Sequence, residues 1–374
     1  MGNNKKYIWP LILLLLTCLI TWRAAQDFLR QFHSDSLVPG GSLSRMGWLS
    51  DYEPALKGTA GDTRIFIFNG DTVSGGKALI LGGTHPDEPA GFVTTYLMIE
   101  NIEIMKGTVF IIPQANNSAF THTLPQEGMP QFFSIPGKSG NRIFRYGARI
   151  TNAIHQWPDP EIYLHYPSGQ KLAGNETRNL NRAYPGRTDG TLTELIAHGI
   201  ISLINKEQID IAFDLHEASP EYPVVNAIVA PEISQDIATE AAMELEFEGL
   251  RYSLEASPYN FHGLSHREWA DHTNCLPFLF ETANPIQGRL RGRTDEDLLL
   301  SGFDKMYLIG KEIGALTVPY DSTGLPIQVR VGRHLAALKK VIEIYSRYYP
   351  DHTIEFSGIP SYQIVEKNGL KEYF

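Results

Sequence analysis

Short apolar runs alternate with amphipathic segments over most of the chain. Runs rich in β-branched and aromatic residues indicate strands at 63–68, 78–81, 109–112, 209–215 and 277–280. Alternation with helical patterns predicts an α/β sandwich with a largely parallel central sheet. The nearly continuous apolar character of these runs indicates a sheet covered on both faces.

Apolar residues at helical spacing predict helices at 89–98, 193–201 and 331–342. The first begins with Pro89, which suits a first helical turn. Pro277 is awkward inside a central strand, so we expect the last strand run to begin at or after it.

The N-terminal segment has the pattern of an export signal. Lys5 and Lys6 precede a nearly unbroken apolar run over 8–20, which is short for a spanning helix and close to a signal-peptide core. Arg23 weakens the cleavage site after Ala25. We expect a signal peptide or signal anchor at 1–25, with a buried N-terminal helix as the alternative. A signal peptide or signal anchor implies an exported protein. Such a protein would be membrane-anchored by this segment, or periplasmic or extracellular.

The rest of the chain divides by composition. Residues 26–61 are polar and rich in Gly, Ser and Pro, and indicate a linker with little structure. A catalytic domain is expected over 62–318, and a C-terminal helical and β extension packed on it over 319–374. The weakly periodic stretch 117–177 is too long for a plain connector and predicts a functional wall or lid.

Composition excludes several classes of protein. The chain has 374 residues, is 43% hydrophobic and carries a formal net charge of −10. A folded globular protein fits this profile, and a general nucleic-acid binder does not, because it would carry a basic surface. The two cysteines, Cys18 and Cys275, cannot build a disulfide framework or a thiolate metal cluster.

Histidines and carboxylates follow several of the predicted strands. His85 and Glu88 lie on a turn after one strand, His216 ends another, and Glu281 ends a third. Ligands collect at the carboxyl edge of open α/β sheets, and zinc accepts imidazole and carboxylate together. The turn alone could equally be a polar turn with a helix-capping acid. The coincidence of all four positions favours a metal site with a carboxylate that serves as a general base.

A separate motif runs from Arg178 through Leu180-Asn181-Arg182 to Gly186. Arginine can hold a carboxylate through two parallel hydrogen bonds, and asparagine adds a neutral donor. A surface salt bridge is the alternative for any single arginine.

In their order along the chain, these motifs resemble the zinc carboxypeptidase superfamily, especially its succinylglutamate desuccinylase and aspartoacylase branch. The resemblance covers roughly 62–315 and rests on Gly-Gly-Thr-His-x-x-Glu, Leu-Asn-Arg-x-Tyr-Pro-Gly, Asp-Leu-His and a late strand-end Glu. It implies a three-layer α/β/α sandwich around a mixed, mostly parallel sheet. It also implies one Zn²⁺ per chain, with His85, Glu88 and His216 as ligands.

The resemblance also assigns roles around the metal. Glu281 would be the general base and acid, and Asn181 with Arg182 would clamp a substrate carboxylate. The spacing of Tyr259 ahead of Glu281 resembles that of a substrate-contacting tyrosine, although an ordinary partly buried tyrosine is the alternative.

The chain departs from the family at two places. Asn179 stands where family members usually have Asp, and Gly174 stands where aspartoacylases have the arginine that polarises the scissile carbonyl. Arg178 is the nearest candidate for that catalytic role, with Arg142 and Arg145 behind it.

These observations predict a zinc-dependent hydrolase that cleaves an amide bond in a carboxylate-bearing substrate. A deacylase acting on an acyl amino acid follows the motifs most directly. An exported metallocarboxypeptidase acting on peptides or cell-wall stem peptides is an alternative, because of the predicted export and the long 117–177 stretch. A membrane-tethered, non-catalytic protein that uses zinc to bind a carboxylate ligand is a third. The expected partners are a small molecule or peptide and a membrane, and not nucleic acid.

Overall fold

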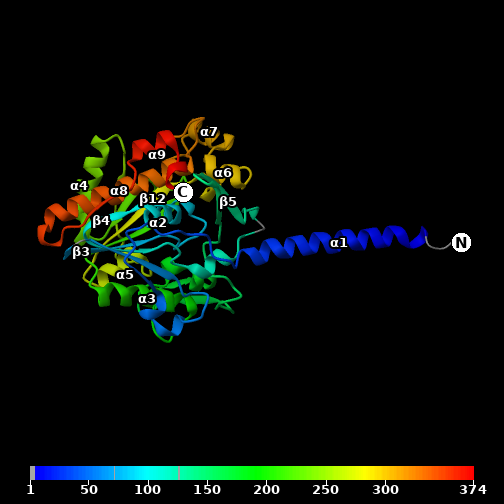
Figure 1. The fold of residues 1–374 in the computed structure, drawn as a ribbon, viewed down its shortest axis with the longest axis horizontal. Helices are drawn as coiled ribbons and strands as arrows, with labels where there is room; N and C mark the ends of the chain where they lie inside the picture. Colours follow the sequence, from blue (N-terminus) through cyan, green and yellow to red (C-terminus); the bar gives the residue numbers. More distant parts are fainter. Residues whose placement is uncertain (1–4, 71, 125–126) are drawn as a thin grey trace.

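A mixed β-sheet covered by helices on both faces forms the centre of the computed structural model, which describes residues 5–70, 72–124 and 127–374 (Figure 1). Its strands are β1 (Arg45–Trp48), β2 (Arg64–Asn69), β3 (Thr72–Leu81), β4 (Glu103–Ile112), β9 (Ile211–Ala218), β10 (Ala227–Ala230), β11 (Ser253–Ala256), β12 (Leu276–Ala283) and β13 (Glu355–Ser357). They lie in the order β1-β2-β4-β3-β9-β12-β10-β11, and β13 pairs with β4. Two small hairpins stand apart, β5 (Phe132–Gly137) with β6 (Gly140–Arg145) and β7 (Ile162–Leu164) with β8 (Lys171–Ala173).

The middle of the sheet is parallel. β4, β3, β9 and β12 pair in parallel, whereas β1, β2, β10 and β13 each join through an antiparallel pairing. The prediction of an α/β fold around a mixed, mostly parallel sheet is confirmed. Parallel pairing brings the carboxyl ends of β3, β9 and β12 to one edge of the sheet, where ligands usually bind in such folds.

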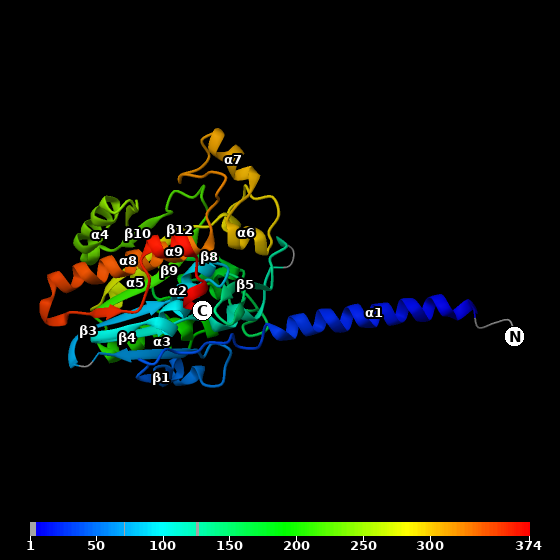
Figure 2. The same ribbon diagram turned by 45° about the horizontal axis from the view of Figure 1, so that its top comes forward.

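Helices cover the two faces separately (Figures 1 and 2). The helices of the structure are α1 (Lys5–Arg30), α2 (Pro89–Asn101), α3 (Leu192–Glu207), α4 (Gln235–Phe247), α5 (Ser265–His272), α6 (Glu296–Ser301), α7 (Lys305–Glu312), α8 (Ile327–Tyr348) and α9 (Tyr362–Asn368). On β3, Ala78 and Ile80 pack on the side of α2, α4 and α8, while Leu79 and Leu81 pack on the side of α3 and α5. Because successive strand side chains point to opposite faces, an unbroken apolar run supplies both cores.

The helix α1 projects away from the domain (Figures 1 and 2). In the part of the chain that the structure describes, one helix is long and apolar enough to cross a membrane, Lys6–Arg30. A signal sequence has the same length and composition. Export and anchoring therefore stay predictions.

Residues 26–61 have more structure than their composition indicates. α1 continues to Arg30, β1 pairs antiparallel with β2, and Leu49 and Leu56 are fully buried against the α3 side of the sheet. Leu49 and Leu56 help to hold this segment on the domain, because each removes apolar area from water.

The last central strand begins one residue earlier than predicted, at Leu276 rather than at or after Pro277. The N–H of Leu276 donates to the carbonyl of Asp210, next to β9. The missing N–H of Pro277 falls on the opposite side, where β10 pairs only from Leu279 onward. No hydrogen bond of the sheet is lost there.

The C-terminal part of the chain, 319–374, is packed on the sheet. The helix α8 lies against α2 and α4, and β13 extends the sheet beside β4. A buried ion pair connects α8 to β9: Nη1 of Arg330 lies 2.8 Å from Oε1 of Glu217, and both side chains are at most 1% exposed. The other oxygen of Glu217 accepts the N–H of Ala90 in the first turn of α2.

We expect Arg330→Met to lower the free energy of unfolding by about 3–5 kcal/mol, because it leaves the Glu217 carboxylate buried without its cation. Denaturant unfolding in a mild detergent measures this. Arg347→Met on the same helix is the matched control, since that guanidinium is half exposed and pairs with Glu244; its loss should cost at most about 1 kcal/mol. Equal losses in the two variants would contradict the assignment.

Candidate metal centre

The candidate metal ligands come from two neighbouring strands. His85 lies in the turn after β3, Glu88 directly precedes α2, and His216 lies near the end of β9. The pairing of β3 with β9 in parallel places these ends together. Gly83 makes the tight turn possible, because its φ is +69° and a side chain there would meet the ring of Phe120.

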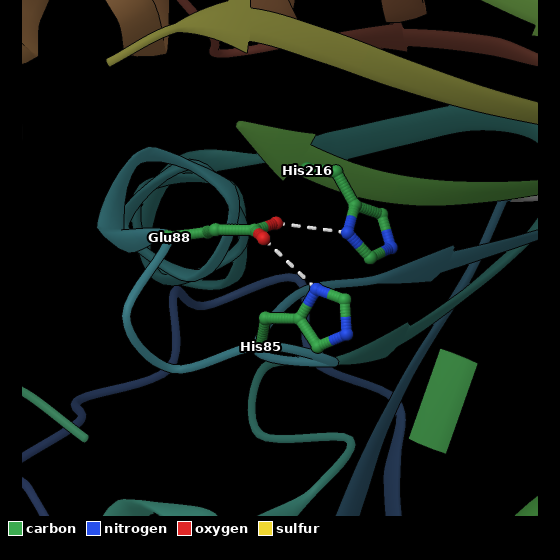
Figure 3. Close-up of side chains that lie close together, drawn as sticks. All are labelled: His85, Glu88 and His216. Carbon is green, nitrogen blue, oxygen red and sulfur yellow. Dashed lines mark hydrogen bonds and ion pairs between the residues drawn. The ribbon is translucent and has the colours of Figure 1, made fainter. Parts of the chain in front are cut away.

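One carboxylate lies between the two imidazole rings (Figure 3). Oε1 of Glu88 is 2.9 Å from Nδ1 of His85, and Oε2 is 2.8 Å from Nδ1 of His216. One ligand atom of each residue lies within 4.8 Å of the other two, and all three side chains are buried. A set of two imidazoles and one carboxylate is suited to zinc.

The far nitrogen of each ring is already engaged. Nε2 of His85 lies 2.9 Å from Oδ1 of Asn179, and Nε2 of His216 lies 2.9 Å from Oδ2 of Asp214. Asn179 accepts the N–H of Asn181 with the same oxygen and donates its amide N–H to Glu176, which fixes the orientation of the amide. Nε2 of His85 must therefore be the donor of that hydrogen bond.

This hydrogen bond leaves Nδ1 of a neutral His85 without a proton. Burial lowers the pKa of His85 to about 4, and Glu88 acts in the opposite direction. The lone pair of Nδ1 then faces a carboxylate oxygen of Glu88 across 2.9 Å. Two acceptors at that distance repel each other unless a cation lies between them, so the donor set fits a metal ion.

The charges around His216 lead to the same requirement. Burial alone would lower the pKa of His216, but Asp214 and Glu88 raise it well above its usual value. Burial alone would raise the pKa of Glu88, but His85 and His216 lower it well below its usual value. The site thus holds anionic oxygens that need positive charge, which a protonated His216 or a divalent cation can supply.

A cavity of about 500 Å³ opens onto this group. Its wall includes Arg149, Asn181, Arg182 and Glu281. Nη1 of Arg149 donates to Oε1 of Glu88 at 2.7 Å, and the arginine side chain is 40% exposed to the cavity. A pocket of this size with convergent charged groups is the usual form of a small-molecule site.

Glu281 lies beside His216, because the two residues are directly paired between β12 and β9. Its Oε2 is buried and has no hydrogen-bond partner within the described residues. Burial raises the pKa of Glu281 to about 8. A cation held by the neighbouring ligands would favour the ionised carboxylate, which is the form that accepts a proton.

Asn181 and Arg182 stand on the cavity wall, close to the metal group. Oδ1 of Asn181 accepts the N–H of Ser265, which leaves its amide N–H groups to donate elsewhere. The guanidinium of Arg182 lies 4.8 Å over the ring of Phe261, with Glu176 at 3.9 Å. Both predicted clamp residues therefore present donors where a substrate could lie.

Arg178 and Tyr259 lie away from this cavity. The guanidinium of Arg178 makes two 2.7 Å hydrogen bonds to Asp159 and one to the carbonyl of Thr151, so it has little left to offer a substrate. Tyr259 is exposed and donates to Glu232. The geometry favours Arg149 over Arg178 as the arginine next to the metal group.

Sequence reasoning missed three residues of the site, Arg149, Asn179 as a partner of His85, and Asp214 as a partner of His216. Arg149 stands in no motif, although it lies in the 117–177 segment that predicts a functional wall. Asn179 is the departure from the family pattern, and its Oδ1 still accepts from the ligand histidine. Asp214 was visible in the Asp-Leu-His motif, where alternation along a strand places it on the same face as His216.

No protein-family model matches the sequence, and no curated protein shows significant sequence similarity to it. Solved structures of similar fold include a succinylglutamate desuccinylase from Silicibacter sp. TM1040, at 19% identity and a TM-score of 0.35 over 59% of this chain and 53% of that chain. The tripeptide-bound cell shape determinant Csd4 from Helicobacter pylori matches at 14% identity and a TM-score of 0.46, over 82% of this chain and 60% of that chain.

The product-bound ectoine utilization protein EutE (DoeB) from Ruegeria pomeroyi matches at 20% identity and a TM-score of 0.35 over 59% of this chain and 53% of that chain. The structural neighbours thus include succinylglutamate desuccinylase/aspartoacylase proteins and Csd4. The chain spans little more than half the length of these proteins. Its chemistry has to follow from its own residues.

We expect Asn179→Ala to weaken zinc binding roughly 10- to 100-fold, because it removes the hydrogen-bond partner of a candidate ligand. His216→Ala removes a candidate ligand itself, and should weaken zinc binding by more than that. Competition with a chromophoric chelator measures both. His198→Ala is the control, because that histidine lies on α3 and pairs with Glu53 away from the cavity. Unchanged zinc affinity in His216→Ala would rule out the site.

Proposed function

We propose that the protein is a zinc-dependent hydrolase that cleaves an amide bond in a carboxylate-bearing substrate. The observation that carries this proposal is the buried group of His85, Glu88 and His216, whose ligand atoms lie within 4.8 Å of one another on the wall of a charged cavity. His85, Glu88 and His216 would hold one Zn²⁺. When bound there, zinc would lower the pKa of a water molecule and polarise the substrate carbonyl.

The chain's own residues supply the proton transfers. Glu281 accepts a proton from the attacking water as the water oxygen bonds to the amide carbon. It then delivers that proton to the nitrogen as the C–N bond breaks, which leaves a carboxylic acid and an amine. Arg149 stands where it can stabilise the negative charge that develops on the carbonyl oxygen.

The other end of the substrate would be fixed by Arg182 and Asn181. A guanidinium and a neutral amide N–H together match a free carboxylate. Holding that carboxylate sets its distance from the scissile bond, and orientation of this kind contributes strongly to the rate. Arg149 and Arg182 supply positive charge on the cavity wall, where Glu88, Glu217, Glu255 and Glu281 also lie. A substrate carboxylate would therefore be recognised by these two guanidinium groups rather than by the charge of the whole chain, which is −10.

The substrate class has two candidates. An N-acyl amino acid fits a cavity with two arginines close to the metal ligands. A peptide with a free carboxylate fits the same groups and the apolar remainder of the wall, which includes Val229, Phe261 and Leu279. A non-catalytic carboxylate-binding protein would have no use for the unpartnered oxygen of Glu281 next to the metal ligands.

The proposed location is outside the cytoplasm, with α1 as a membrane anchor or signal. Lys5 and Lys6 precede the apolar segment, and positively charged flanks stay on the cytoplasmic side. The cavity would then meet substrates on the exported side.

Release of primary amine from a paired panel of N-acyl amino acids and free-carboxylate peptides tests the activity. Glu281→Gln should keep its zinc and lose roughly 10²-fold or more in turnover, because the variant cannot accept the water proton. Glu244→Gln on α4, far from the cavity, should keep full activity. Full turnover in Glu281→Gln would overturn the general-base assignment. Release from one half of the panel only would decide between deacylase and carboxypeptidase.

We expect Arg182→Ala to raise KM by about 10- to 100-fold with a smaller change in kcat, as for loss of a hydrogen bond to a charged group. The measurement compares each substrate with its carboxyl-amidated analogue. Wild type and Arg182→Ala should treat the amidated analogues alike, and Arg347→Ala serves as a remote arginine control. An equal loss on both kinds of substrate would show that Arg182 does not bind the carboxylate.

A further inference from the structure

Large apolar side chains gather on one exposed surface of the 117–177 segment. Five of them form what we call the β7 face: Ile154, Trp157, Ile162, Leu164 and Tyr166, all exposed. On β7 the outer residues point to solvent, while Tyr163 between them is buried. A strand of a sheet with one solvated face usually points its apolar residues towards the core, and β7 does the reverse. Exposed apolar patches mark sites that bind a protein, a ligand or a membrane.

Three members of the β7 face share one hollow, and Tyr166 lies at its border. Trp157, Ile162 and Leu164 line the same open hollow of about 650 Å³, together with His155. Trp157 is 73% exposed. The guanidinium of Arg187, which also lines the hollow, lies 5.5 Å from the ring of Tyr166. Asp159 and Glu194 also line the hollow, and Arg187 pairs with Glu194 at 3.4 Å. Aromatic side chains beside polar and charged groups are typical of proteins at the polar layer of a membrane.

The base of α1 lies directly beside the β7 face. Phe32, just after the helix, makes an edge-on contact with His155, with ring centroids 6.2 Å apart. On its other side, the guanidinium of Arg30 lies 4.6 Å over the ring of Phe132 in β5. The helix therefore leaves the domain between the β5 hairpin and the β7 face, and any bilayer that contains α1 lies close to that face.

Buried polar contacts fix this junction. Gln31 is fully buried, donates to the carbonyl of Tyr146, and accepts from Nη1 of Arg145. Asp35 pairs with Nε of Arg145 at 3.2 Å and accepts from Gln114. Breaking such a junction would strand buried charges, so the domain keeps a set orientation relative to α1.

We propose that the β7 face rests on the polar layer of the bilayer that α1 crosses. The apolar part of α1 ends near Trp22, and residues 23–30 rise about 12 Å beyond it at 1.5 Å per residue. The polar layer is about 5–8 Å deep on each side of the hydrocarbon core. Because Phe32 at the base of α1 contacts His155 beside the β7 face, a tilt of α1 towards that face would lower it to this layer.

A bilayer is favoured over a protein partner by this continuity. Beyond the apolar part of α1, Phe28, Leu29 and Phe32 are exposed, and Phe32 contacts His155 beside the β7 face, so exposed apolar side chains continue from the helix to that face. The same contact would hold the cavity at a set height above the membrane, because the 117–177 segment that carries the β7 face also supplies Arg149 to the cavity wall. The inference rests on α1 lying in a bilayer and not on amide hydrolysis.

The experiment uses the full chain in phosphatidylcholine vesicles, with Cys18→Ser as background so that a dye reacts only at a new cysteine; Cys275 is fully buried. The dye is placed at Trp157→Cys or, as a second variant, at Leu164→Cys. Phe247→Cys on α4 is the matched control, since Phe247 is 87% exposed and lies on a helix remote from α1 (Figure 1). Some vesicles carry a nitroxide on the lipid headgroup, and others are unlabelled.

We expect the nitroxide lipid to reduce dye emission about twofold or more at positions 157 and 164, and to leave position 247 nearly unchanged, because only the β7 face lies in the headgroup layer. No quenching at 157 and 164 overturns the proposal. Emission that changes there with protein density but not with the nitroxide also overturns it, in favour of a second copy as the occupant. A chain that does not float with the vesicles overturns it too. Amine release measured on the same samples reports separately on the proposed hydrolase.

Discussion

The site depends on one buried carboxylate between two imidazoles. Glu88 places one oxygen against each histidine, and Arg149 reaches the same carboxylate from the cavity. Burying a carboxylate is costly unless it is paired and hydrogen-bonded. Because Oδ1 of Asn179 accepts a hydrogen bond from Nε2 of His85, a neutral ring turns the lone pair of its Nδ1 towards Glu88. With the ligand atoms of His85, Glu88 and His216 all within 4.8 Å of one another, this group could hold a metal ion.

The scaffold behind Glu88 is equally specific. Glu217, next to His216 in β9, donates its backbone N–H to Glu88 and accepts the first free N–H of α2 with its side chain. Arg330 of α8 closes this network from the other side. Glu217 thus joins three elements: the strand β9, the start of α2 and the C-terminal helix α8. The C-terminal segment 319–374, which the sequence predicts as an extension, therefore helps to hold the candidate metal ligands.

The segment 117–177 contributes side chains to two surfaces of the molecule. It supplies Arg149 to the cavity and the β7 face to the outside, next to the base of α1. Gln31 and Arg145 join the same segment to the chain that follows α1. A rigid junction of this kind lets an N-terminal helix set the position of a site that is distant from it in the sequence.

The sequence by itself determined the strands of the sheet centre, the order of the motifs and the three ligand candidates, because strand and turn signals are local and parallel strands share one carboxyl edge. His85, Glu88 and His216 could be found for that reason. Asn181 and Arg182 could be placed near them only through the resemblance to a family. Residues 26–61 show the limit of composition, since a strand pairing and a few buried side chains dock a stretch that is polar overall.

Only the tertiary structure decided which polar groups meet. It brought Arg149 to Glu88 across a loop, directed Arg178 to Asp159 instead, and left Tyr259 at the surface. A guanidinium at the end of a long side chain can reach many partners, and its choice depends on where remote backbone segments lie. The β7 face was likewise hidden in the sequence, because whether an apolar strand residue points inward or outward is decided by what packs against it.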